Sequence, residues 1–151
     1  MACEIREKFI LPSILLPEVV GKSVPVAVHV QVGSGDTSLF SYYREAMGKM
    51  KGIFPDAVFL VFCEESEKCS DFIARLGPGI VLLPPMDEFD AMAMMHSCTA
   101  FILSDSTFCW WSAWLSGSLH VIYPEMQNST NFDLPGNLWA ANFSRCAGII
   151  P

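Results

Sequence analysis

Short apolar runs alternate with amphipathic segments along most of this chain. Val24–Val32, with the letters VPVAVHVQV, is rich in β-branched residues and apolar on both faces, which predicts a buried strand. Further apolar runs predict strands at Ala57–Cys63, Ile80–Leu83, Ala100–Leu103 and Leu119–Tyr123. Segments with helical spacing lie between them and predict helices at Leu39–Ile53, Glu64–Leu76, Glu88–Ser97 and Thr107–Ser116. This alternation predicts an α/β fold, a three-layer Rossmann-like parallel sheet of about five strands with helices on both faces.

The two ends of the chain do not follow this pattern. Residues 1–23 form an N-terminal extension, in which Glu4–Leu11 predicts a short helix ended by Pro12. Ile14-Leu15-Leu16 is apolar enough to dock on a neighbouring element. After Pro124 the chain is rich in Asn, Ser and Thr, and Leu138–Cys146 predicts a closing helix. The main domain is therefore expected over residues 24–151.

Composition and charge narrow the classes of function. Of the 151 residues, 52% are hydrophobic and 17% charged, which excludes a disordered chain. The formal net charge is −7, whereas a general binder of nucleic acid or of an anionic membrane needs a basic field. No apolar run approaches the ~20 residues that a membrane-spanning helix requires. We therefore expect no nucleic-acid partner and no membrane span in this chain.

The six cysteines include no CxxC pair, and none has zinc spacing with the three histidines, so no metal site is expected. Most of the cysteines lie in apolar or helical surroundings, which favours free buried thiols over disulfides.

Two of the loops that follow the predicted strands could bind an anion. Ligands of parallel sheets bind at the carboxyl ends of the strands. Gly33–Ser38 is a glycine-rich turn between a strand and a helix, a layout that lets backbone N–H groups approach phosphate, although most such turns only reverse the chain. Ser104–Thr107 leads into the helix that follows, with Asp105 or Ser106 as its N-cap.

Three segments together resemble the alpha-1,2-fucosyltransferase family, glycosyltransferase family 11. Ser104–Leu115, SDSTFCWWSAWL, is similar to the family's NSTFSWWGAWL segment, which is the most specific of the three. Val61–Glu65, VFCEE, resembles the family's FSDD turn, and Tyr42-Tyr43 resembles its YY helix. His29–Asp36 stands where the family has HxRRGD. The resemblance covers roughly Val24 to Pro124 and preserves the order of these pieces.

The resemblance implies the C-terminal half of a GT-B fold, which binds the donor GDP-fucose without a metal or other cofactor. The acceptor-side half would precede Val24, where this chain has no room for it, so the glycan acceptor would be bound by a separate domain. Relatives work in the Golgi lumen of eukaryotes or in the bacterial cytoplasm. Carried over position by position, the implied donor-binding residues are His29, Gln31, Gly33, Ser34, Gly35, Asp36, Glu64, Glu65, Ser106, Thr107 and Phe108.

One departure from the family pattern leaves more than one functional hypothesis open. Both arginines of HxRRGD are replaced, by Gln31 and Val32, so no guanidinium neutralises the leaving diphosphate there. The first hypothesis is transfer of fucose from GDP-fucose to a galactoside hydroxyl with inversion. The alternatives are a catalytically inactive nucleotide-binding module and a purely structural domain.

Several of the implied residues also have a structural interpretation. His29 is either a buried histidine bonded to backbone or a ligand-binding group. Glu64 and Glu65 are either a solvated helix start or the groups that bind the base. For Trp110, Trp111 and Trp114, a place in the core is favoured over a sugar platform.

Overall fold

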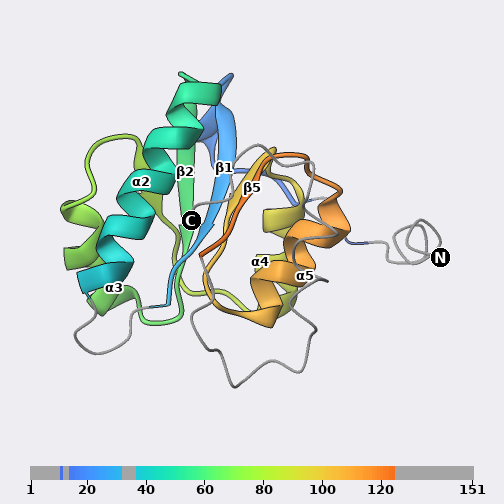
Figure 1. Cartoon of the computed structure of the whole chain (residues 1–151). Coiled ribbons are helices and arrows are strands. Elements are labelled where there is room, and N and C mark those ends of the chain that lie inside the picture. Colours follow the sequence, from blue (N-terminus) through green and yellow to red (C-terminus); the bar gives the residue numbers. More distant parts are fainter. Residues whose placement is uncertain (1–10, 12–13, 32–36, 125–151) are drawn as a thin grey trace.

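The computed structural model describes residue 11, residues 14–31 and residues 37–124. A five-stranded parallel sheet occupies its centre, with strand order β3-β2-β1-β4-β5 (Figure 1). The strands are β1 (Val24–His29), β2 (Ala57–Phe62), β3 (Ile80–Leu82), β4 (Ala100–Ile102) and β5 (Val121–Ile122). Its helices are α2 (Thr37–Ile53), α3 (Ser66–Ala74), α4 (Glu88–His96) and α5 (Thr107–Ser116), with a short 3-10 helix, η1, at Glu18–Val20. The predicted Rossmann-like α/β fold is confirmed.

Most strands end earlier than their apolar runs predict. β1 ends at His29 rather than Val32, at the point where the hydroxyl of Tyr43 donates a hydrogen bond of 2.9 Å to the carbonyl oxygen of His29. β2, β3 and β4 each end one residue early, and β5 keeps only two residues. α3 likewise begins at Ser66 rather than Glu64. The apolar runs therefore mark burial and extend beyond the paired strand residues, although the backbone N–H groups of Val30, Leu83 and Leu103 still bond to the neighbouring strands.

Helices cover both faces of the sheet, α2 and α3 on one face and α4 and α5 on the other (Figure 1). Successive strand residues point to opposite faces. In β1, Val26 and Val28 belong to the apolar cluster under α2 and α3, while Ala27 belongs to the cluster under α4 and α5. The sheet is therefore buried on both sides, as its continuous apolar strands require.

The helix α5 carries three tryptophans, which divide between core and surface. Trp110 and Trp114 are buried and their rings are stacked, with centroids 6.4 Å apart. Trp111 is 42% exposed, so the expectation of a core position is wrong for this residue. Helical periodicity explains the difference, because Trp111 is offset by about 100° from Trp110 around the helix axis.

The end of the N-terminal extension packs on the domain. Val20 is buried and Leu16 packs against the cluster under α4 and α5, whereas Leu15 is 92% exposed. The helices predicted at Glu4–Leu11 and Leu138–Cys146 lie outside the described residues, apart from Leu11. Among the described residues, no helix combines the length and apolar character needed to cross a membrane.

Candidate functional site at the carboxyl edge of the sheet

The strand order reverses between β1 and β4. From β1 the chain proceeds through α2 to β2 on one side, and from β4 through α5 to β5 on the other. In open α/β sheets this reversal leaves a crevice beyond the carboxyl ends of the two central strands, where ligands bind. The two loops selected from the sequence therefore follow neighbouring strands. Of the first loop, Gly33, Ser34, Gly35 and Asp36 lie outside the described residues.

A cavity of about 220 Å³ lies at this edge, on the face covered by α4 and α5. Its lining comes from the ends of β1 and β2, from the loop between β3 and α4, and from the first turns of α4 and α5. The lining residues are His29, Phe62, Cys63, Glu64, Leu83, Pro84, Pro85, Met86, Glu88, Ala91 and Phe108. Residues from three separate family-like segments, His29, Glu64 and Phe108, therefore meet in one space.

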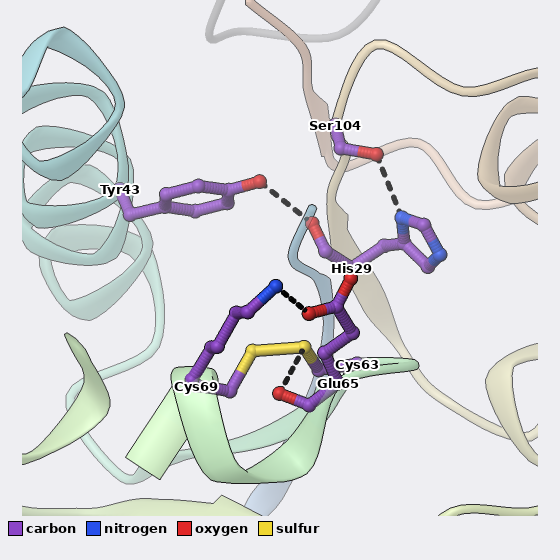
Figure 2. Close-up of a disulfide and its surroundings, with 7 residues drawn as sticks. His29, Tyr43, Cys63, Glu65, Cys69 and Ser104 are labelled. Carbon is purple, nitrogen blue, oxygen red and sulfur yellow. Dashed lines mark hydrogen bonds and ion pairs between the residues drawn. A yellow bond between two sulfur atoms is a disulfide. The ribbon is translucent and has the colours of Figure 1, made fainter. Parts of the chain in front are cut away.

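His29 is held between the two halves of the sheet. Its side chain is 5% exposed, and Nδ1 lies 2.6 Å from the hydroxyl oxygen of Ser104, two residues after the neighbouring strand β4 (Figure 2). The rings of His29 and Phe108 have centroids 5.8 Å apart. Burial lowers the pKa of His29 to about 4, so the imidazole is neutral near pH 7. Its partner is the side chain of Ser104, in the loop that follows β4, and not the backbone, and its ring lines the cavity.

The hydrogen bond between Ser104 and His29 can form with either tautomer of the neutral imidazole, and the contacts of Cys109 are compatible with one of them. Burial raises the pKa of the Cys109 thiol to about 11, so it stays protonated, and it donates to the carbonyl oxygen of Ser106 at 3.2 Å. The Ser104 hydroxyl, 3.6 Å from Cys109 Sγ, is then free to donate to Nδ1 of His29. A neutral imidazole that accepts at Nδ1 carries its proton on Nε2. In this arrangement His29 is a hydrogen-bond donor to a ligand.

The two adjacent glutamates of the loop after β2 have different environments. Glu64 lines the cavity. Glu65 forms an ion pair with Lys68 and is not part of the lining. Glu88, from the start of α4, is a second carboxylate in the lining, which contains no Lys or Arg among the described residues. Of the two candidates for binding the base, only Glu64 lines the cavity.

Most of the remaining candidate residues do not line the cavity. Gln31 is exposed and lies outside the lining, and Thr107 is exposed as well. Ser106 occupies the N-cap position of α5, as one of the two predicted N-cap residues, but its side chain makes no capping hydrogen bond. Phe108 follows at the first turn of α5 and does reach the cavity.

The prediction of free thiols is wrong for two of the cysteines. Cys63, the first residue after β2, forms a disulfide with Cys69 of α3, with Cα atoms 6.8 Å apart. The turn between β2 and α3 brings the two residues together, which a search for CxxC spacing does not detect. Cys98 and Cys109 are free and buried, as predicted.

Sequence reasoning placed Ser104 in a candidate loop but did not select it as a site residue, and it missed most of the cavity wall. Ser104 had a detectable signal, because it follows a central strand directly, one residue before the first of the two N-cap candidates. For Pro84, Pro85 and Met86 the signal was their place after the third predicted strand, at the same edge of the sheet. Ala91 carries no chemical signal at all.

Together the fold and the cavity define a Rossmann-like domain with a ligand crevice at its switch point. Residues 25–134 match the family model described as Glycosyl transferase family 11. The chain belongs to this family. Its fold corresponds to the C-terminal half of a GT-B fold.

Two solved structures share this fold. The S. aureus MnaA-UDP co-structure has a TM-score of 0.58 and 11% identity, covering 76% of this chain and 32% of that one. A protein described as a UDP-N-acetylglucosamine 2-epimerase from Listeria monocytogenes has a TM-score of 0.60 and 12% identity, covering 82% and 34%. The chain thus spans about a third of the length of these neighbours. No curated protein sequence matches it significantly.

Proposed function

We propose that this domain binds the nucleotide-sugar donor of a fucosyl transfer reaction, with GDP-fucose as the donor and a galactoside hydroxyl as the acceptor. The observation that carries the proposal is the convergence of His29, Glu64 and Phe108 on one cavity at the switch point. The three segments that supply these residues are the ones that resemble the fucosyltransferase motifs. Membership of glycosyltransferase family 11 supports the same class of reaction.

The chemistry of the cavity favours the guanine base as its occupant. Pockets that enclose a drug-sized ligand have volumes of roughly 300–1,000 Å³, so a cavity of about 220 Å³ accommodates only part of a nucleotide sugar. A guanine edge presents N–H donors, and the carboxylates of Glu64 and Glu88 are acceptors. An anionic phosphate would be repelled by the same two carboxylates. We therefore place the base in the cavity and the diphosphate outside it, near the N-terminus of α5 and Nε2 of His29.

Calorimetric titration with GDP tests the binding step. Because a charge-assisted hydrogen bond is worth about 1.5–3 kcal/mol, Glu64→Gln should weaken GDP binding roughly tenfold or more. Glu65→Gln is the matched control and should leave the affinity unchanged, since Glu65 lies outside the cavity. UDP, the ligand of one structural neighbour, should bind more weakly than GDP. Equal affinities of the two glutamate variants would contradict the proposed site.

The transfer step needs its own assay. The domain is incubated with GDP-fucose and a galactoside acceptor, alone and together with an acceptor-side half from a family 11 relative. We expect transfer only in the combined arrangement, and we expect it to persist in a chelator because no metal takes part. If GDP binds but no fucose is transferred in either arrangement, the transfer step is contradicted and only the binding function remains.

One observation favours that second candidate, a catalytically inactive nucleotide-binding module. The described lining of the cavity contains two carboxylates and no cation, and Gln31 stands in place of an arginine. A guanidinium beside the leaving diphosphate stabilises the charge that develops in the transition state. Under this alternative, the double variant Gln31→Arg/Val32→Arg should bind GDP more tightly than the native chain. An unchanged affinity would count against a missing cation as the cause of inactivity.

A further inference from the structure

The Cys63–Cys69 disulfide connects the cavity to the helix α3. Cys63 is half-buried and lines the cavity directly after β2, whereas Cys69 is completely buried against the face covered by α2 and α3. Between them lies a short turn that carries Glu64 and Glu65. Figure 2 shows Glu65 beside the disulfide. The bond therefore ties the residue adjacent to Glu64 to a fixed point in the core.

The other contacts described for this turn are weak. Glu64 and Glu65 are exposed, and Glu65 makes no capping hydrogen bond at the start of α3. Its ion pair with Lys68 is open to solvent, and exposed pairs of this kind contribute at most about 1 kcal/mol. One backbone bond remains, from the N–H of Cys69 to the carbonyl oxygen of Glu65 at 3.1 Å. The disulfide is the strongest restraint on the position of Glu64 among these contacts.

We propose that the Cys63–Cys69 disulfide positions Glu64 for nucleotide binding, and that its reduction weakens that binding. In the reaction, a dithiol reductant supplies two electrons and two protons, the S–S bond breaks to give the thiols of Cys63 and Cys69, and the reductant becomes a disulfide. This inference rests on the proposed function, because it assigns a regulation to the same site. It makes Cys63 and Cys69 positioning residues.

Among the described cysteines, Cys63 is the half of the disulfide that borders the cavity, and the two free thiols do not exchange with it. Cys63 lies on the wall of the cavity and is half-buried, whereas Cys98 and Cys109 are buried thiols. Burial raises the pKa of Cys98 to about 12 and that of Cys109 to about 11, which makes both thiols poor nucleophiles. Ordering a flexible residue costs about 1–2 kcal/mol, so freeing the turn should weaken GDP binding roughly tenfold.

The bond itself can be mapped in one digest. Trypsin cleaves after Lys51, Lys68 and Arg75, so the non-reduced protein should yield peptides 52–68 and 69–75 joined through one disulfide. Reduction should separate them. Recovery of both peptides with free thiols from the non-reduced protein would overturn the inference.

The effect on binding is measured by titrating GDP into the oxidised and the reduced chain. We expect the reduced chain and the double variant Cys63→Ser/Cys69→Ser to bind about tenfold more weakly, and the double variant to be insensitive to the reductant. Cys98→Ser is the control and should remain as sensitive as the native chain. In a Glu64→Gln background, reduction should have little further effect, because the disulfide acts through Glu64. Equal affinity before and after reduction, or full sensitivity in the Glu64→Gln background, would overturn the inference.

Hydrogen exchange separates this inference from the proposed function. If GDP binds in neither redox state, the proposed function fails. The exchange of the backbone amides of residues 64–68 then still decides whether the disulfide orders the turn. We expect faster exchange there after reduction, with little change in β1 and β4. Unchanged exchange in this turn would overturn the positioning role by itself.

Discussion

At the carboxyl edge of the sheet, the face under α2 and the face under α4 and α5 are built in opposite ways. Under α2, two tyrosines fill the edge. The hydroxyl of Tyr42 donates to the carbonyl oxygen of Leu103 at 2.6 Å, and that of Tyr43 donates to the carbonyl oxygen of His29 at 2.9 Å. On the other face, the ends of β1 and β2 border the cavity.

His29 belongs to both faces at once. Its carbonyl oxygen accepts a hydrogen bond from Tyr43, while its ring faces Ser104 (Figure 2). The same ring contacts Phe108 and lines the cavity. The filled face thus fixes the backbone from which the open face presents its functional groups. The difference teaches that the packed side of the sheet supports the backbone from which the cavity's groups project, which is the support that a preorganised site needs.

The largest effect is expected from emptying the filled face. Tyr43 is completely buried, so Tyr43→Ala should lower the free energy of unfolding by about 3–5 kcal/mol. Tyr43→Phe should cost only about 1 kcal/mol, because it removes the hydrogen bond and keeps the packing. Urea unfolding followed by circular dichroism measures both. A cost below 1 kcal/mol for Tyr43→Ala would show that this face is not the packed support described.

A pair of alanines compares the two faces directly. Ala46 of α2 is completely buried and well packed, so Ala46→Leu should destabilise the chain by about 1–3 kcal/mol. Ala91 of α4 borders the cavity, so the leucine of Ala91→Leu has space to occupy and should cost less than about 1 kcal/mol. That same leucine should abolish GDP binding. Equal costs in thermal unfolding would contradict the comparison.

Acidification should act through His29. Its pKa is about 4 in the folded chain and 6.5 in the unfolded one, so below pH 6.5 the unfolded state binds a proton that the folded state does not. The contribution of His29 to the free energy of unfolding is therefore fully present above pH 6.5 and is lost as the pH falls towards 4. Between pH 8 and pH 5 we expect a loss of about 2 kcal/mol. Denaturant titrations at both pH values should show the loss in the native chain and not in His29→Gln.

The smallest effect concerns the bond that orients the imidazole. Ser104→Ala removes the partner of His29 Nδ1 and should cost about 1 kcal/mol. Ser112→Ala is the matched control in α5, where the hydroxyl only bonds back to the carbonyl oxygen of Phe108 at 2.9 Å, and its cost should stay within about 0.5 kcal/mol. If the two variants unfold at the same denaturant concentration, the buried pair contributes nothing specific.

The sequence predicted some elements of this edge well, for identifiable reasons. The bounds of α5 were predicted to the residue, because Ser106 precedes it and Gly117, with φ of 69°, ends it in the left-handed conformation. Ser104 and His29 are neighbours because β1 pairs with β4, and the crossover rule fixes the hand of each connection but not this strand order.

The cavity and the disulfide depend on distances that no local pattern encodes. Ala91 reaches the cavity only because α4 crosses the sheet between β3 and β4. Glu64 and Glu65 are consecutive residues in an irregular turn, so the periodicity of the sequence does not determine which of them faces the cavity. Cys63 and Cys69 meet because the chain reverses sharply after β2.

The wall formed by Pro84 and Pro85 has a consequence for selectivity. Proline has no backbone N–H, and its ring holds φ near −65°, so this side of the cavity offers no amide donor and has little freedom to adapt. A ligand that fits flat against this side pays little entropy to immobilise it. A ligand that carries an extra acceptor there would lose a bond to water and find no replacement. On this side the cavity therefore selects ligands by their shape. Selection by hydrogen bonding depends on the polar residues elsewhere in the lining.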